Sequence, residues 1–241
     1  MKPYRYVKRR IEPEAQGSSD RRQSRPKIAA KGLMVAGTMI IGSVIWPIVS
    51  YEVFTAPSLK PQQFVTPIPV KGSEPDQFGS ASQELLNPTD WFPNAKPNTA
   101  RESKITHYTL SIPKFNIIDA TVAIGGEDLS KNLVQYKGSA LPGELGATII
   151  FGHSILPQFF NPKNYKAIFS LVPTMEIGDE VLIKFDGISY TYRVIDKTEV
   201  KPDNLTVLEQ SYDNEYLRLI TCTPPGTYLR RAVITAALIK V

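Results

Sequence analysis

The chain has 241 residues, of which 42% are hydrophobic and 21% are charged, and its formal net charge is +5. This length holds one ordinary domain with additional segments, and the composition excludes a fibrous or fully disordered protein. A basic chain would suit nucleic-acid binding, but residues 1–31 carry +7 and the remaining 210 residues carry −2. The basic excess is confined to an N-terminal tail, so we expect no nucleic-acid partner.

Residues 32–51 form an apolar run with no charged side chain. As a helix rising about 1.5 Å per residue, this run spans roughly 30 Å, the thickness of a bilayer's hydrocarbon core. Trp46 and Tyr51 suit the membrane interface at its far end. We predict a single transmembrane helix over 32–51, with the basic tail of 1–31 in the cytoplasm and the chain after Glu52 outside it.

A cleaved signal peptide is the alternative to a retained anchor. Signal peptides have a shorter basic lead and a shorter apolar stretch than this chain, and they end in a small-residue cleavage pattern. Here the lead has 31 residues, and no such pattern follows the run before Glu52. These features favour a retained anchor.

Residues 52–105 are rich in proline, with eight prolines between 52 and 104. Proline interrupts helices and central strands, so we predict an extended spacer between the membrane and the folded domain. The segment 85–93 (Leu-Leu-Asn-Pro-Thr-Asp-Trp-Phe-Pro) is unusually apolar for a spacer. We expect it to pack on the domain.

From residue 106 onward, short β-branched and aromatic runs alternate with turn residues, and Asp186 and Gly187 form a hairpin signal. We predict an all-β domain over 106–241, a closed or nearly closed barrel of seven or eight strands with short helices at 129–134 and 165–171. The predicted strands cover 108–112, 117–124, 147–152, 181–185, 188–195, 217–222 and 232–241.

Cys222 is the sole cysteine, so no intramolecular disulfide forms. It ends a predicted strand and is followed by Thr-Pro-Pro-Gly-Thr at 223–227, which turns the chain out of the sheet. Two interpretations stay open from this strand alone, a nucleophile that substrate can reach and an inert buried cysteine.

His153 also follows a predicted strand, and Arg230 and Arg231 begin the last one. A thiol of pKa near 8.5 is only about 3% ionised at pH 7, so a thiol enzyme needs a neighbouring imidazole or cation. An arginine that returns beside Cys222 would hold a substrate carbonyl or oxyanion. A solvated turn histidine and a charge at a strand edge are the structural alternatives. The sequence contains no metal-ligand set and no cofactor motif, so we expect neither group.

These features together resemble the sortase family, the membrane-anchored cysteine transpeptidases of bacterial cell surfaces. The resemblance is carried by Leu-Ile-Thr-Cys at 219–222, Ile-Phe-Gly-His at 150–153 and Arg-Ala-Val-Ile at 231–234. It covers 106–241, and the tail, anchor and spacer fit it as well. Weaker matches lie at 111–114, 141–146 and 177–181.

The resemblance implies an eight-stranded sortase-type β-barrel in which Cys222 is the nucleophile and His153 the general acid and base. Arg231 would stabilise the substrate carbonyl, and it is preferred to Arg230 because one residue then separates it from the apolar pair at 233–234. The candidate substrate-binding residues are Arg230, Ile150, Leu219 and Thr221.

The implied reaction cleaves an LPxTG-like sorting signal of a surface protein between Thr and Gly and leaves a thioacyl enzyme. An amine of a peptidoglycan precursor, or a pilin lysine, then resolves this intermediate. The resemblance implies a bacterial cell membrane as the location, and it implies no cofactor.

Three features bear on the subclass. No second apolar span follows the barrel, which favours a housekeeping or class D/E-like enzyme. The sequence at 87–92 resembles the Asp-Pro-aromatic lid of pilin-type members, so Asp90, Trp91 and Phe92 are candidate lid residues. The acidic connection at 201–215 lies where the family places a specificity loop.

Two alternative functions stay open at this point. One is a thiol peptidase or hydrolase that uses the same residues, with water in place of the amine. The other is a non-enzymatic, membrane-tethered β-barrel in which Cys222 is part of the core.

Overall fold

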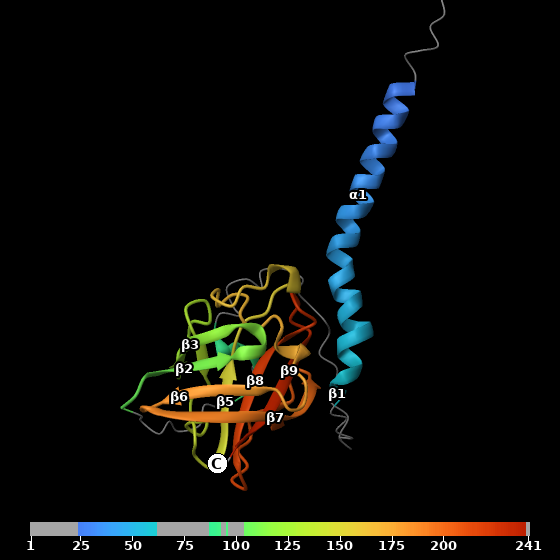
Figure 1. The fold of residues 1–241 in the computed structure, drawn as a ribbon. Coiled ribbons are helices and arrows are strands. Elements are labelled where there is room, and N and C mark those ends of the chain that lie inside the picture. The colour runs from blue at the N-terminus through green and yellow to red at the C-terminus, as the bar shows by residue number, and fades with distance from the viewer. Residues whose placement is uncertain (1–23, 62–86, 93–94, 96–103, 240–241) are drawn as a thin grey trace, which may run out of the picture. The chain divides into compact units, whose positions relative to one another are not determined.

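The computed structural model describes residues 24–61, 87–92, 95 and 104–239 (Figure 1). The chain divides into two compact units, Met1–Val44 and Ile45–Val241. The described residues of the first unit belong to helix α1 (Ser24–Ser50), whose last residues lie in the second unit. Most of the predicted spacer and most of the basic tail lie outside the described residues.

The membrane anchor predicted from the sequence corresponds to a helix. In the described part of the chain, one helical stretch, Ala30–Ser58, is long and apolar enough to cross a membrane. This stretch includes the predicted span at 32–51, and its length and composition fit a membrane anchor.

The helical conformation continues past the predicted end of the span. A π-helical turn, η1 (Tyr51–Thr55), and a 3-10 turn, η2 (Ala56–Ser58), follow α1 directly. The expectation that the spacer is extended from its first residue is therefore wrong for residues 52–58. Pro57 is tolerated because it lies at the start of η2, where its missing N–H group is not needed.

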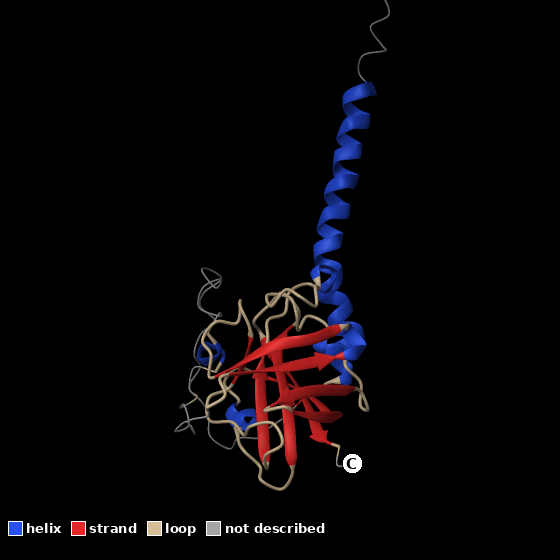
Figure 2. Ribbon diagram, turned by 60° about the vertical axis from the view of Figure 1, so that its left-hand side comes forward, coloured by secondary structure: helices blue, strands red, loops and turns tan. Residues whose placement is uncertain are grey.

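The second unit is built on a closed β-barrel (Figures 1 and 2). Eight strands follow one another in the order β7-β6-β2-β3-β4-β5-β8-β9, and β9 pairs with β7 to close the barrel. A two-residue strand, β1 (Lys60–Pro61), pairs in parallel with β7. The barrel strands are β2 (His107–Ile112), β3 (Ile117–Ile124), β4 (Leu133–Gln135), β5 (Gly146–Phe151), β6 (Glu180–Phe185), β7 (Ile188–Val200), β8 (Glu215–Thr223) and β9 (Arg230–Leu238).

This architecture confirms the predicted all-β barrel, with two local corrections. Residues 129–134 form no helix; instead β4 pairs with β3 and β5. Every residue of β4 is buried, so its short apolar run carries no alternation to distinguish strand from helix. Residues 165–171 form turns rather than a helix. The short 3-10 helices are η3 (Pro88–Trp91), η4 (Pro113–Phe115), η5 (Pro157–Phe159), η6 (Val172–Thr174) and η7 (Leu205–Leu208).

The predicted hairpin joins β6 to β7. Phe185 pairs with Ile188 across the turn, and Asp186 and Gly187 between them have φ angles of 50° and 76°. Both values lie in the left-handed region that a two-residue hairpin turn requires, which is why Asp-Gly is favoured there.

Alternate residues of the strands form two hydrophobic layers. On β8, Leu217 and Leu219 join the cluster that fills the barrel interior. Ile220 and Cys222 join a second cluster, which contains Trp91. Successive side chains of a strand point to opposite faces, so Cys222 lies on the outer face of the barrel, beneath covering residues.

Candidate active site

Cys222 lies one residue before the end of β8, between β9, which carries Arg231, and the chain that continues past the end of β5 to His153. On one side it is paired with Arg231 of β9. On the other side, β5 runs parallel to β8 with Phe151 opposite Ile220. Because the two strands are parallel, two residues further along each of them His153 lies opposite Cys222. Residues that lie directly opposite each other point to the same face of a sheet. The structure therefore brings these three residues together on one face.

Hydrogen bonds keep the chain beside β8 after β5 ends. The Gly152 N–H group donates to the Ile220 carbonyl at 3.2 Å, and the Thr221 hydroxyl donates to the Gly152 carbonyl at 2.8 Å. The Ser154 hydroxyl donates to the carbonyl of Cys222 at 2.7 Å. Ser154 directly follows His153, the candidate base, and its side chain is 7% exposed, so this hydrogen bond is buried.

Glycine is required at position 152 because the neighbouring side chains leave no space. A Cβ atom there would lie 2.4 Å from the Phe169 ring and 2.7 Å from a Leu133 methyl carbon. The Phe169 N–H group also donates to the His153 carbonyl at 3.0 Å. The close approach of Phe169 therefore fixes the backbone that carries the imidazole.

Trp91 and Phe92 cover this site, with exposed fractions of 0% and 1%. The Trp91 ring centroid lies 5.9 Å from that of His153 and 5.4 Å from the guanidinium carbon of Arg231. The Trp91 carbonyl accepts a hydrogen bond from Arg231 Nη2 at 3.3 Å. The expectation that this apolar segment packs on the domain is confirmed for these two residues, whereas Asp90 is exposed.

Arg231 is 2% exposed and tightly held. Its Nη1 donates to the carbonyls of Tyr228 and Arg230 at 3.0 and 3.1 Å. Its Nε is buried and has no hydrogen-bond partner among the described residues, and the same is true of His153 Nε2. A buried nitrogen atom without a hydrogen-bond partner lowers the stability of the folded state unless a ligand supplies that partner. Both nitrogen atoms can therefore form a hydrogen bond with a bound polar group.

Burial dominates the ionisation of the site. It raises the pKa of the Cys222 thiol to about 11, with the Arg231 guanidinium opposing the shift. It lowers the pKa of the His153 imidazole to about 4; the Lys166 ammonium lowers this pKa further and the Asp128 carboxylate raises it. In the covered state both groups are therefore neutral near pH 7.

The candidate substrate-binding residues lie elsewhere. Ile150 and Leu219 belong to the cluster inside the barrel, and the Thr221 hydroxyl is bound to the Gly152 carbonyl. Arg230 forms ion pairs with Glu52 and Glu199. The structure does not bring these four residues onto the face that Cys222 occupies.

The connection at 201–215 packs beside the site. It contains η7, whose Val207 belongs to the same cluster as Cys222. Arg218 donates from Nη1 to the carbonyls of Val207 and Glu209 at 2.9 and 2.6 Å, which fastens this connection to β8. Within the described residues, no group of three His, Cys, Asp or Glu side chains is arranged to hold a metal ion.

Sequence reasoning missed two contributors to this region. Ser154 had no signal, because a single serine after a histidine does not reveal a bond to a distant carbonyl. Tyr51 was noticed as an aromatic residue at the end of the apolar run, but the expectation that it lies at the membrane interface is wrong, because its side chain is 4% exposed and packs with the barrel core.

Comparison with known proteins identifies the family. The model of the Sortase domain matches residues 110–239. This chain belongs to the sortase family. Sortases are membrane-associated cysteine transpeptidases, so the chain is an enzyme of that class, and its apolar N-terminal helix fits a membrane anchor.

The relatives of this sortase include different classes. It is 25% identical over 205 residues to sortase D of Bacillus subtilis strain 168, covering 82% of this chain and 89% of the relative. The solved structure of sortase C1 from Streptococcus agalactiae is 27% identical with a TM-score of 0.50, covering 68% and 80% of the two chains. Sortase C-1 from Actinomyces oris, at 19% identity and a TM-score of 0.51, covers 63% and 93% and shares the fold. A class D/E-like assignment is consistent with the similarity to sortase D.

Proposed function

We propose that this sortase cleaves an LPxTG-like sorting signal between Thr and Gly and transfers the acyl fragment to an amine. The observation that carries the proposal is the alignment on one face of Cys222 in β8, Arg231 in β9 and His153 two residues beyond the end of β5. A nucleophile, a proton carrier and an oxyanion-stabilising cation are the groups that this acyl transfer needs.

In the first step, His153 takes the proton of the Cys222 thiol while the sulfur attacks the threonine carbonyl carbon and forms a C–S bond. The carbonyl oxygen becomes an oxyanion, toward which the guanidinium of Arg231 contributes its unpartnered Nε–H group. The C–N bond to glycine then breaks, and His153 gives a proton to the leaving amine. A thioester between the substrate threonine and Cys222 remains.

In the second step, an incoming amine attacks the thioester carbonyl carbon. His153 takes a proton from that amine, the new C–N bond forms, and the C–S bond breaks to restore the cysteine. The acceptor is a peptidoglycan precursor or a pilin lysine. Similarity to sortase D and to sortase C1 supports an amine acceptor, and these two candidate acceptors correspond to different sortase classes.

Asp90, Trp91 and Phe92 are proposed to act as a lid. Trp91 contacts both His153 and Arg231, and its packing contributes to the burial that keeps the thiol and the imidazole neutral. Removal of this cover exposes the sulfur to substrate and lowers the cost of forming a thiolate. Asp90 would act at the exposed rim, and the 201–215 connection is proposed to contribute to the choice of sorting signal.

The proposed location is the bacterial cell membrane. Residues 1–31 would lie in the cytoplasm and residues 32–51 would cross the membrane once. The barrel, which begins at residue 106, would lie outside. The charge of +7 before the apolar run supports this orientation by the positive-inside rule.

Product analysis with the full chain and an LPxTG peptide tests this function. With a diaminopimelate-type amine or triglycine present, we expect a ligated product, and with water alone only slow hydrolysis. Cys222→Ala and His153→Ala should abolish both, and Arg231→Ala should lower kcat/KM by about 100-fold or more, because a guanidinium aimed at an oxyanion is lost. Cleavage by Cys222→Ala at the parent rate would refute the assignment. Hydrolysis that no amine diverts would favour a thiol peptidase.

A further inference from the structure

We propose that the segment directly after the apolar run, residues 51–59, is part of the catalytic unit, and that Arg230 and Glu199 are positioning residues that couple it to the strand end beside Cys222. The proposal rests on the function proposed for Cys222. It reassigns Arg230, which the sequence predicts to bind substrate.

The segment is packed into the barrel core at both ends. Tyr51 and Leu59 are only 4% and 2% exposed, and both belong to the hydrophobic cluster that contains Leu219 and Ala232 of the barrel interior. Immediately afterwards, β1 pairs in parallel with β7, with Pro61 opposite Glu199. Burial of two large side chains and a backbone pairing show that this segment is attached to the barrel rather than merely tethered to it.

A continuous polar chain runs from this segment to the residue after the nucleophile. Glu52 forms an ion pair with Arg230 Nη2. Arg230 Nε lies 3.0 Å from Glu199 Oε1, and the same carboxylate oxygen accepts a hydrogen bond from the Thr223 hydroxyl at 2.7 Å. Thr223 follows Cys222 and is itself the strand partner of Arg230. Four elements, η1, β7, β8 and β9, therefore meet in one network.

The two ion pairs of this network differ in burial. The Glu199 side chain is 8% exposed, so its carboxylate depends on Arg230 for charge compensation, and loss of that cation would leave a buried charge unpaired. The Glu52 side chain is 43% exposed, and such a pair contributes little stability by itself. The buried pair of Arg230 with Glu199 thus fixes the start of β9. The exposed pair of Arg230 with Glu52 links the segment to that strand.

This arrangement bears on catalysis through the next residue. Arg230 and Arg231 are consecutive in a strand and point to opposite faces. When Arg230 is held by two carboxylates on one face, Arg231 is directed to the other face, where Cys222 lies opposite it. The network therefore sets the position of the guanidinium that stabilises the oxyanion, without contacting the substrate.

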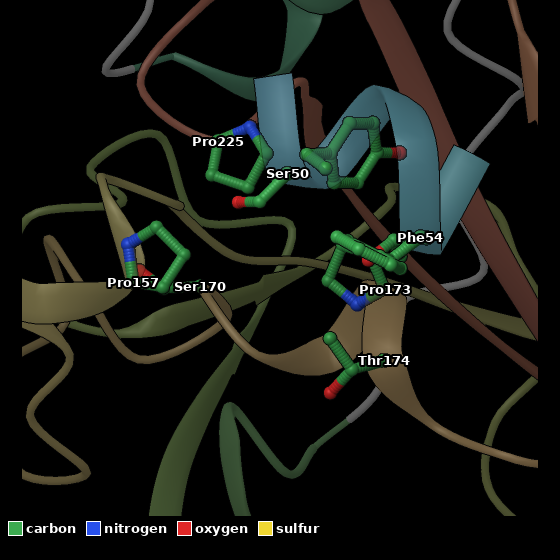
Figure 3. Close-up of a pocket in the computed structure, with 9 residues that line it drawn as sticks. Ser50, Phe54, Pro157, Ser170, Pro173, Thr174 and Pro225 are labelled. Carbon is green, nitrogen blue, oxygen red and sulfur yellow. The ribbon is translucent and has the colours of Figure 1, made fainter. Parts of the chain in front are cut away.

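A cavity of about 170 Å³ lies where the segment meets the loops that leave the site. Figure 3 shows Ser50 and Phe54 on one side of this cavity and, across it, Pro157 of η5 and Pro225 of the loop after β8. Pro225 follows Cys222 by three residues, and Pro157 follows His153 by four. The segment thus borders the chain that follows each of the two catalytic residues, and we expect its displacement to move both.

A double-mutant cycle in the full chain, reconstituted in lipid nanodiscs, tests this coupling. Glu52→Gln and Arg230→Gln should each lower kcat about fivefold with KM nearly unchanged, because misplaced catalytic groups slow chemistry rather than binding. The double variant should be no slower than Arg230→Gln alone, and Arg230→Lys should recover part of the rate. Glu180→Gln is the matched control, since it removes an exposed ion pair with Arg193 elsewhere on the barrel.

Three results would overturn the proposal. A rise in KM for Arg230→Gln, with Glu52→Gln at the parent rate, would mean that Arg230 binds substrate. Multiplicative effects of the two changes on kcat would mean that they act independently. Parent kinetics in all variants, with only a lower melting temperature, would mean that the network is purely structural. Retained activity in Cys222→Ala, by contrast, would refute the proposed function and leave the measured coupling intact.

Discussion

The barrel interior and the covered outer face beside β5, β8 and β9 are held by different kinds of contact. Inside, side chains from strands distant in sequence interdigitate, and continuous backbone pairing closes the barrel. Outside, Trp91 and Phe92 pack on Phe151 by aromatic contacts, and the Trp91 carbonyl accepts a hydrogen bond from Arg231 of β9. The interior therefore maintains the fold, whereas the cover is proposed to leave without disrupting it.

The first prediction contrasts the stability of the two layers. Leu219→Ala should lower the free energy of unfolding by about 3 kcal/mol, because it leaves a cavity in a closed core. Trp91→Ala should lower it by less than about 1 kcal/mol although tryptophan is the larger residue, since the cover can move away and leave no cavity in the barrel. Chemical denaturation of the full chain in detergent measures both values. Equal losses would show that the cover is an integral part of the core.

The second prediction concerns the thiol beneath the cover. Trp91→Ala should bring the pKa of Cys222 down from about 11 toward its ordinary value, because water then reaches the sulfur. At pH 8 the thiolate fraction, and with it the alkylation rate, should rise about 10- to 100-fold. The pH dependence of alkylation measures this change, with Tyr212→Ala, at an exposed aromatic residue, as the control. An unchanged rate in Trp91→Ala would refute the lid.

The third and smallest effect is a pH dependence of stability. The folded protein keeps His153 neutral down to about pH 4, whereas the unfolded chain protonates it near pH 6.5. The unfolded state binds more protons in this window, so the free energy of unfolding falls as the pH is lowered through it. Because the ring is partly exposed, we expect a loss of about 2 kcal/mol, less than the full shift implies. Urea titrations at a series of pH values should show that the free energy of unfolding depends less on pH in His153→Gln than in the parent. The same pH dependence in both proteins would contradict this account.

Much of the fold follows from local patterns in the sequence. Short β-branched and aromatic runs between turn residues indicated seven of the barrel strands, and Asp186-Gly187 indicated the hairpin between β6 and β7. The strand missed, β4, has only three residues, Leu133–Gln135, which is too short for a run of strand-forming residues to stand out from its neighbours. The helical turns at 51–58 were missed because proline content was taken to exclude helix, although Pro57 lies at a position that tolerates it.

The site was predictable in its members but not in its arrangement. Strand ends and residue types indicated Cys222, His153 and one of Arg230 and Arg231, and the resemblance to sortases favoured Arg231. The proximity of these residues depends on the register of β5 with β8 and of β8 with β9. Such pairings join residues far apart in the chain, and sequence periodicity does not encode them. For the same reason, the opposite orientations of Leu219 and Cys222 could not be assigned to the interior and the site before the barrel was known to close.

Mass spectrometry of the full chain after incubation with an LPxTG peptide, without an added amine, tests the central claim most directly. We expect a covalent adduct on the peptide that contains Cys222, with the mass of the fragment ending in threonine, and its disappearance when an amine is added. Trp91→Ala should accumulate this adduct faster. Turnover of the peptide with Cys222 unmodified throughout, or an adduct at another residue, would contradict the account.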